Sequence, residues 1–295
     1  MTAEPLGGED FVPFHREGRP VNPTVNDWMA AVSRSVRCMR ENIGDSHSLS
    51  SLARSALLSP FHFHRVFRQL TGSTPARFLA ALRMAEAKWL LATTSTSVTD
   101  ICMQVGYSSL GTFTTQFTRM VGVSPRRFRR LIEPVADRSF DTVLAAIQAV
   151  VATPATVQVT TAVTGGPASG AFALVGLFPS GIPQEQPVAC SVASVPGIAS
   201  LGNAQDGDYH VLAMSFSRSV TVLDTLVCQD SAACFVGVSP IPVRIRDGRS
   251  TSPAPVQVQL RAPRPIDPPL VLALPLLLAA EVDRQMEVPV GEHPG

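Results

Sequence analysis

The sequence lacks the marks of a secreted, membrane-spanning or metal-binding protein. Its five cysteines are scattered and odd in number, without a Cys-x-x-Cys pair, which favours reduced thiols over a disulfide framework or a zinc site. Cys228 and Cys234 could form a redox-sensing pair, although a free cysteine is more often a small buried hydrophobe. No basic start leads into an apolar run, so we expect no signal peptide. The most apolar stretch, residues 268–280, is too short for a membrane span of about 20 residues. These absences indicate a cytoplasmic protein without a membrane partner.

Motifs of catalysis and cofactor binding are missing as well. The sequence has no Gly-x-Ser-x-Gly nucleophile elbow, no Gly-rich loop ending in Gly-Lys-Ser/Thr and no His-Glu zinc motif. His210 stands alone on a predicted strand, where a histidine is more often structural than catalytic. We therefore expect neither an enzyme nor a bound cofactor or metal.

Acidic residues are scarce in one block of the chain. Residues 46–132 hold eleven Lys and Arg against two acids, Glu86 and Asp100, which gives a net charge of +9. Residues 133–295 hold eight against fourteen, which gives −6, and the first 45 hold five against seven, which gives −2. The whole-chain charge of +1 hides this division. A polyanion is the expected partner of the basic block.

The basic block contains an internal repeat. The segment SPFHFHRVFRQLTG at 59–72 returns as SLGTFTTQFTRMVG at 109–122, with an offset of 50 residues. Apolar residues in both segments follow the spacing of one buried helical stripe: Phe63, Val66, Phe67 and Leu70 in the first, and Phe113, Phe117, Met120 and Val121 in the second. A shorter apolar pattern precedes each segment, so each repeat is predicted to be a helix, a turn and a second helix.

Start and stop residues set the expected limits of these helices. Ser48 and Ser59 are predicted N-caps, and Ser97 with Asp100 predicts a capping box. Gly106 lies where a left-handed residue would end a helix. Two further helices are expected: Asn26 or Asp27 would cap the first, and Thr74 with Pro75 would open a long one of about 25 Å.

This pattern resembles the DNA-binding domain of the AraC/XylS family of transcription regulators, in which two helix-turn-helix units are joined by a long helix. The likeness covers residues 26–131. Its most specific part is VTDICMQVGYSSLGTFTTQFTRMVGVSPRRFRR, with the glycine-aromatic turn, the phenylalanine spacing and the G-x-[ST]-P-x-x-[FY]-R ending. The resemblance implies that the long helix holds two recognition helices about one DNA turn, or ~34 Å, apart.

The resemblance also implies which side chains face double-stranded DNA. In the first unit the outward positions are Phe61, His64 and Arg65, where Arg65 can bond a guanine edge and Phe61 can touch a thymine methyl. A solvated arginine is the alternative for Arg65. In the second unit the base-facing positions include Leu110 and Thr115, which cannot make bidentate base contacts, so the first unit is expected to carry most of the sequence discrimination.

Backbone contacts are expected from polar and basic residues around both recognition helices. The residues expected to contact phosphates are Ser59, Ser109, Thr112, Arg119, Arg126 and Arg127, with Arg129 and Arg130 in the same basic cluster. Such a cluster is often only a solvated face, but the local excess of positive charge favours phosphate contact.

The carboxy-terminal half has a different residue pattern, which is typical of β-strands. After a predicted helix at 140–151, short β-rich runs are separated by Gly, Pro and Asp, a pattern typical of an antiparallel sandwich or barrel. A weak resemblance to prealbumin-like sandwiches favours the sandwich. The expected architecture is an α-then-β multidomain chain: a flexible segment at 1–25, a tandem helix-turn-helix domain at 26–134, a linker at 135–155, a β-sandwich at 156–282 and a tail at 283–295.

Most members of the family place their second domain before the DNA-binding unit, whereas here the DNA-binding unit comes first. The β domain could bind a small-molecule effector, form a homodimer or contact RNA polymerase, with the apolar residues 270–280 as a dimer contact. Some proteins with this DNA-binding unit carry alkyl-transfer domains with a Pro-Cys-His-Arg segment, which is missing here. The sequence therefore predicts a sequence-specific transcription regulator in the cytoplasm, at the nucleoid. The alternative is a ligand-binding or scaffolding protein that the helical domain tethers to DNA.

Overall fold

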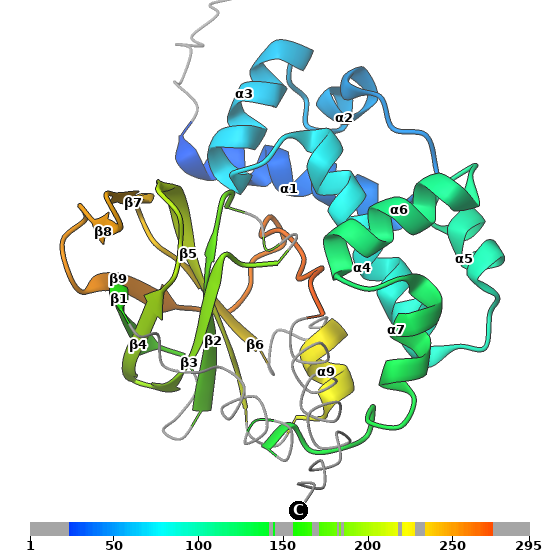
Figure 1. Cartoon of the computed structure of the whole chain (residues 1–295). Coiled ribbons are helices and arrows are strands. Elements are labelled where there is room, and N and C mark those ends of the chain that lie inside the picture. The colour runs from blue at the N-terminus through cyan, green and yellow to red at the C-terminus, as the bar shows by residue number, and fades with distance from the viewer. Residues whose placement is uncertain are drawn as a thin grey trace, which may run out of the picture.

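A computed structural model of the chain describes residues 24–141, 144, 156–166, 171–181, 183, 186–217, 220–227 and 234–273. Helices come first in this part of the chain and a β-rich region follows (Figure 1). The helices of the first half are α1 (Val25–Glu41), α2 (Leu49–Ser55), α3 (Pro60–Thr71), α4 (Pro75–Thr93), α5 (Val98–Gln104), α6 (Leu110–Val121) and α7 (Pro125–Ile132). The predicted pair of helix-turn-helix units, α2–α3 and α5–α6, is therefore present, with the long helix α4 between them.

Side-chain caps explain most of these helix starts. Ser48, Ser59, Thr74 and Ser97 accept backbone N–H bonds as predicted. Asn26 or Asp27 as the cap of α1 was wrong, because Thr24 is the N-cap and the Asp27 carboxylate completes a capping box with it. In α5 the Asp100 carboxylate instead accepts the hydroxyl of Ser97, at 2.7 Å.

The repeat also has a structural reason at the helix ends. Gly72 closes α3 and Gly122 closes α6, each in the left-handed conformation that glycine adopts without strain. Gly106 has a φ of +84° after α5, as expected. At the corresponding turn of the first unit, Leu57 takes the same left-handed conformation, with a φ of +60°, so the two units share this geometry although only one of them has glycine there.

The β-rich region contains two sheets. Its elements are β1 (Val157–Gly165), β2 (Ala171–Phe178), β3 (Ala189–Val195), β4 (Gly197–Gly202), β5 (Gly207–Phe216), α9 (Val222–Val227), β6 (Cys234–Val238), β7 (Val243–Arg246), β8 (Arg249–Ser250) and β9 (Val256–Leu260). One sheet has the order β4-β1-β9, and the other has the order β3-β2-β5-β7-β8, with β6 also on β5. All strand pairs are antiparallel except β1 and β9, which run parallel, so the fully antiparallel expectation was wrong for that pair.

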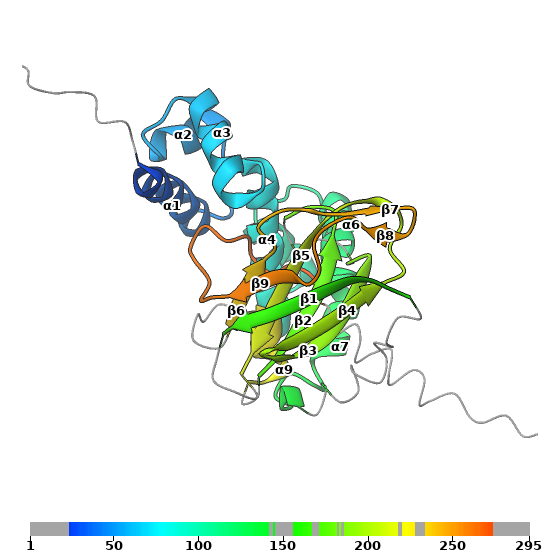
Figure 2. The same ribbon diagram turned by 90° about the vertical axis from the view of Figure 1, so that its left-hand side faces the viewer.

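The six-stranded sheet is apolar on both faces. On β5, Tyr209, Val211 and Ala213 point into an apolar cluster shared with the three-stranded sheet, because side chains alternate along a strand. Met214 and Phe216 point the other way and pack against the helices. Figure 2 looks onto the three-stranded sheet, with the six-stranded sheet and then α6 and α7 behind it.

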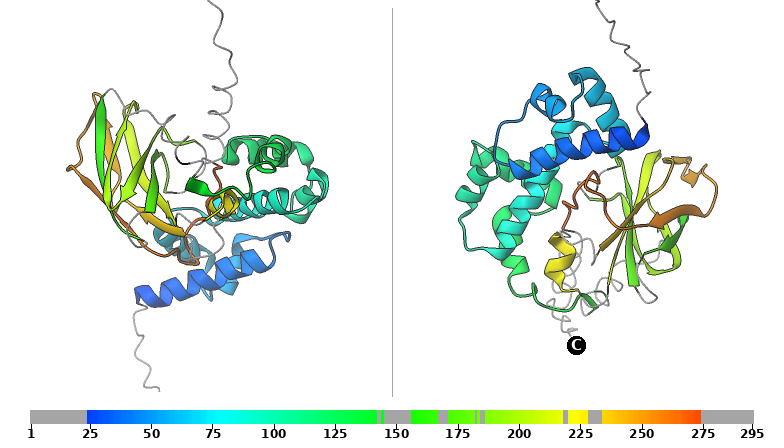
Figure 3. Two further views of the ribbon diagram at one scale, coloured as in Figure 1. Left: turned by 90° about the horizontal axis from the view of Figure 1, so that it is seen from below. Right: turned by 180° about the vertical axis from the view of Figure 1, so that it is seen from behind.

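The helical part and the β-rich region thus share one apolar core. Buried residues of α4 to α7 pack with Phe216, Val222 of α9 and the segment Val271–Ala273. The two views in Figure 3 show the helices beside the sheets, with α9 between α4 and the strands. The two parts are therefore packed on one another through buried apolar residues.

Several expectations meet the limits of the described residues. The predicted helix at 140–151 lies mostly outside them. Within residues 270–280, Val271, Leu272 and Ala273 are buried in the chain's own core, so they cannot supply a dimer contact. Most of the other residues of this stretch lie outside the described part.

Cys38, Cys102 and Cys190 are free, but Cys234 is disulfide-bonded, so the expectation of reduced thiols throughout was wrong. Among the described helices, none is long and apolar enough to cross a membrane.

Lys88 lies at the centre of the contact between the two halves. It is the only lysine of the sequence, and it is 1 % exposed on α4. Its Nζ donates to the carbonyl oxygens of Leu270, at 2.9 Å, and Val271, at 3.3 Å. We call the segment that follows β9, residues 261–273, the strap. These two bonds fasten the strap to the long helix α4. Burial lowers the pKa of Lys88 from 10.5 to about 7.

We expect Lys88 to make stability depend on pH. The folded-state pKa is below the unfolded value, so above about pH 7 the unfolded chain holds a proton that the folded chain has released, and the free energy of unfolding rises with pH until about pH 10. The slope from one such group is up to about 1.4 kcal/mol per pH unit. Urea unfolding of the wild type and of Lys88→Met across this range measures it. Equal slopes in the two proteins would contradict the assignment.

Candidate nucleic-acid interface

The amino-terminal end of α3 presents the first set of predicted contact residues. Ser59 caps the helix by accepting the His62 N–H, at 3.4 Å, and its hydroxyl proton remains available to a further acceptor. Phe61 is 84 % exposed, Arg65 is exposed and His64 is half-buried. A large aromatic side chain left in water next to an arginine indicates a contact surface rather than a core position.

The same end of α6 is also open, with a different chemistry. Ser109 caps α6 by accepting the Thr112 N–H, at 3.4 Å. Leu110 is 41 % exposed, and Thr112 and Thr115 are exposed. This edge offers hydroxyl and methyl groups but no charged side chain.

The opposite faces of both helices are buried, as the periodicity predicted. Phe63 and Phe67 of α3 are fully buried, as are Phe113 and Phe117 of α6. The rings continue edge-to-face into the following helices, with Phe67 on Phe78 at 5.3 Å and Phe117 on Phe128 at 6.0 Å between ring centroids. Rigid aromatic cores therefore hold both exposed edges.

The basic residues divide into two groups. Of the eleven Lys and Arg in residues 46–132, Arg83, Lys88 and Arg129 donate side-chain hydrogen bonds to backbone carbonyls. The other eight, eleven minus these three, are exposed: Arg54, Arg65, Arg68, Arg77, Arg119, Arg126, Arg127 and Arg130. All three predicted phosphate-binding arginines, Arg119, Arg126 and Arg127, belong to the exposed group.

Arg126 and Arg127 occupy the first turn of α7. Positive side chains are unfavourable there, because the amino-terminal end of a helix carries a partial positive charge. The N–H of Arg127 donates to the Ser124 hydroxyl, at 3.4 Å, and the N–H of Phe128 donates to the Ser124 carbonyl, at 2.8 Å. A bound anion would therefore relieve this repulsion chiefly through the two guanidinium groups.

Arg129, which the sequence placed in the same basic cluster, is half-buried and bonded within the protein. Its Nε donates to the Leu91 carbonyl, at 3.2 Å, and its Nη2 to the Thr96 carbonyl, at 2.6 Å. It therefore joins α7 to the end of α4. Sequence spacing alone cannot separate such an arginine from its exposed neighbours.

Arg83 connects the segment between α1 and α2 to the second helix-turn-helix unit, a role that the sequence did not indicate. From α4 its guanidinium donates to the carbonyls of Ile43 at 3.0 Å, Asp45 at 2.6 Å and Gly106 at 3.2 Å. It also lies over the Tyr107 ring, 5.7 Å from the centroid. One side chain thus fixes the end of the α1 region and the turn of the second unit to the same helix.

Comparison with known proteins identifies the helical part. Residues 52–131 match the model of a helix-turn-helix domain. The HTH-type transcriptional regulator Rv1931c of Mycobacterium tuberculosis is 34 % identical over 91 residues, which are 31 % of this chain and 35 % of that protein. The bifunctional transcriptional activator/DNA repair enzyme AdaA of Bacillus subtilis is 30 % identical over 115 residues, which are 38 % and 53 %. The chain thus spans between a third and about half of these relatives.

A solved structure is similar to part of the chain. The transcriptional regulator with an AraC-type DNA-binding domain from Chromobacterium violaceum is 27 % identical, with a TM-score of 0.34. The match covers 35 % of this chain and 93 % of that one.

We expect Arg83→Met to destabilise the helical part by about 1–3 kcal/mol, because three carbonyl groups lose a charged donor. Arg77→Met on the same helix is the control, since Arg77 is exposed and a surface change costs less than about 0.5 kcal/mol. Urea unfolding followed by far-ultraviolet circular dichroism compares the two. Equal unfolding free energies for both variants would contradict a stabilising role of the Arg83 hydrogen bonds.

Proposed function

We propose that the chain is a sequence-specific DNA-binding transcription regulator of the AraC/XylS type, because residues 52–131 match a helix-turn-helix domain. The observation that carries the proposal is the pair of recognition helices, α3 and α6, whose leading edges are open to solvent while their other faces are packed on α4 and its neighbours. An α-helix fits the major groove, so two such helices can enter successive groove segments.

Base readout is assigned mainly to α3. Arg65 would bond a guanine through O6 and N7, Phe61 would contact a thymine methyl, and His64 would reach a base or a phosphate. On α6, Leu110 and Thr115 would make apolar and single hydrogen-bond contacts only. The exposure of Phe61, Arg65, Leu110 and Thr115 supports the assignment, and His64 is half-buried beside them.

Phosphate contacts are assigned to the residues around these edges. The proposed contacts are Ser59, Ser109, Thr112, Arg119, Arg126 and Arg127. About six neutralised phosphates give a log–log dependence of affinity on salt with a slope of about −5.

The β-rich region is proposed to be a regulatory β-sandwich of the prealbumin-like kind, within the domain limits given by the sequence (26–134 and 156–282). The cluster shared by its two sheets supports a sandwich. Its acidic balance disfavours DNA as its ligand. We place the protein in the cytoplasm, at the nucleoid, without a catalytic role, and with RNA polymerase as a further partner.

A tethered ligand-binding or scaffolding protein is the competing function, and DNA preference separates the two. Sites selected from random DNA should bind ~10³ times or more tightly than random competitor in gel-shift titrations if the chain is a regulator. Equal affinity for all sequences would favour the tether.

We expect Arg65→Ala to weaken the selected site by about 1–3 kcal/mol and to relax preference at one base pair. A repeat of the selection with the variant reads out this relaxation. Uniform weakening of selected and random DNA would rule out a base contact by Arg65.

Arg127→Ala should instead weaken all sequences alike and flatten the salt slope by about one unit. Arg249→Ala is the matched control, because Arg249 is an exposed arginine of the β-rich region. Titrations over a range of salt concentrations compare the three proteins. An unchanged slope in Arg127→Ala would argue against its phosphate contact.

A further inference from the structure

We propose that the chain binds a neutral, mostly apolar small molecule with one hydrogen-bonding group in a cavity between α3 and the six-stranded sheet. The cavity has a volume of about 330 Å³. It is bounded by the end of α3, by β2, β5 and β6, and by the strap that Lys88 fastens. This inference rests on the proposed regulator function, which it extends by naming a regulatory ligand class and its site.

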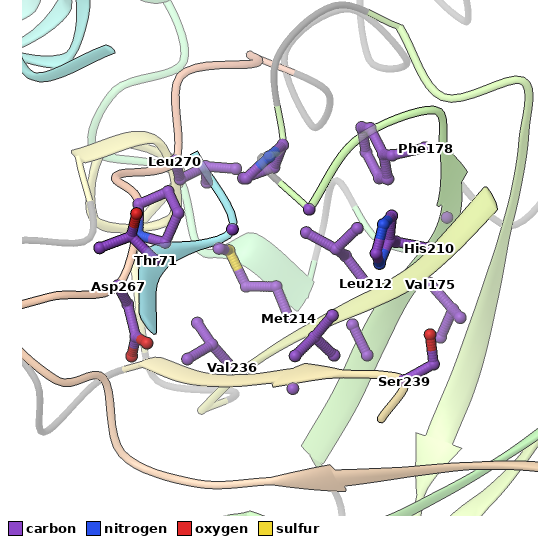
Figure 4. A pocket seen from close by; sticks show the side chains of 18 of the residues that line it. Thr71, Val175, Phe178, His210, Leu212, Met214, Val236, Ser239, Asp267 and Leu270 are labelled. Atoms are coloured by element: carbon purple, nitrogen blue, oxygen red, sulfur yellow. The ribbon is translucent and has the colours of Figure 1, made fainter. Parts of the chain in front are cut away.

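The walls of the cavity select apolar ligands. They include Leu174 and Phe178 of β2, Leu212 and Met214 of β5, and Val236 of β6. Figure 4 shows how these side chains, Leu174 apart, surround the hollow. Small-molecule sites are typically concave, mostly apolar and ~300–1,000 Å³ in volume, so the size fits a compact aromatic or branched aliphatic molecule.

The charged residues at the cavity already satisfy one another. Both terminal N–H groups of Arg261 donate hydrogen bonds to the Asp267 carboxylate, at 2.6 and 2.8 Å. The Arg264 backbone N–H donates to the same carboxylate, at 2.6 Å. A bidentate pair of this kind is nearly neutral as a unit. It leaves no strong field to attract a charged ligand.

His210 supplies a polar group on the sheet side of the cavity. Its ring lines the cavity beside Leu212 (Figure 4), and among the described residues no hydrogen bond to it is found. Burial lowers its pKa below the ordinary value, so the ring is neutral near pH 7, with one donor and one acceptor nitrogen. Ser239 lies nearby on the cavity wall; its Oγ accepts the Val211 N–H, at 3.1 Å. A single ligand hydroxyl, carbonyl or amine matches the ring.

Occupation of this cavity would reach the DNA-binding edge through one rigid element. Leu70, Thr71 and Gly72, at the last turn and cap of α3, line the cavity. The first turn of the same helix carries Phe61. A ligand that contacts both α3 and β5 stabilises one placement of α3 against the sheet, and therefore changes the position of its leading edge.

The test uses N-phenylnaphthylamine, a neutral dye that fluoresces in apolar surroundings and has one N–H donor for His210. The full chain should bind it with one-to-one stoichiometry. Leu212→Trp fills the cavity and should weaken dye binding by about tenfold or more. Ile198→Trp is the control, because Ile198 is 57 % exposed on β4 of the other sheet and should leave binding unchanged. Loss in Leu212→Trp alone supports the site.

His210→Phe checks the polar contact without emptying the cavity. It should weaken the dye several-fold while leaving competition by naphthalene, which has no polar group, unchanged. Circular dichroism and gel shifts without dye show that each variant is folded. No dye binding by the folded full chain, or equal binding by wild type and Leu212→Trp, would overturn the site.

The effect of the ligand on DNA binding is measured in a separate experiment. Saturating dye should change affinity for the selected DNA site about threefold or more in the wild type but not in Leu212→Trp. Dye binding with no effect on DNA affinity would overturn the coupling. Preference for the selected DNA site without dye binding would contradict only the ligand site and leave the proposed function intact. Dye binding without any DNA preference would contradict the proposed function and leave the ligand site intact.

Discussion

The arrangement of this molecule depends on a six-stranded sheet that is apolar on both faces. Such a sheet cannot leave either face in water without a large cost in exposed apolar surface. The three-stranded sheet covers one face, and α4, α6, α7 and α9 cover the other. The helices of the helix-turn-helix part therefore act as a structural layer of the β-rich region. This requirement makes the two halves one body and places a ligand-sized hollow where the covering layer is incomplete.

Arginine and lysine have distinct tasks within the helical half. A guanidinium can donate in several directions at once, and Arg83 and Arg129 use this to join helix ends through carbonyl oxygens. Lys88 makes two bonds to one strap and is fully covered. The exposed arginines point into solvent instead. The same positive block therefore supplies both the internal links of the helical half and its exposed charge.

Local features of the helical half were predictable from the sequence. The offset of 50 residues, the serine and threonine caps and the phenylalanine spacing are short-range signals, and they located α2 to α6 and the buried faces of α3 and α6. The cap of α1 was missed because Thr24, Asn26 and Asp27 are all good cap residues, and only the backbone decides among them. Arg129 was misassigned because its carbonyl partners lie more than thirty positions earlier in the sequence.

Long-range features were not accessible in the same way. Strand order depends on pairings between distant segments, as for β1 with β9. One signal for the shared core was present: both alternating sets of residues in YHVLAMSF are largely apolar, which is typical of a strand covered on both sides. The cavity at His210 could not be found, because residues from α3, three strands and the strap form it together.

Because Lys88 is the single lysine of the chain and is buried, the folded protein should not react with reagents that modify lysine side chains. Acylating reagents, and enzymes that modify lysine, find no accessible side-chain target while the strap covers α4. Appearance of a modified Lys88 would therefore report separation of the helical layer from the sheet, with no other lysine to obscure the signal.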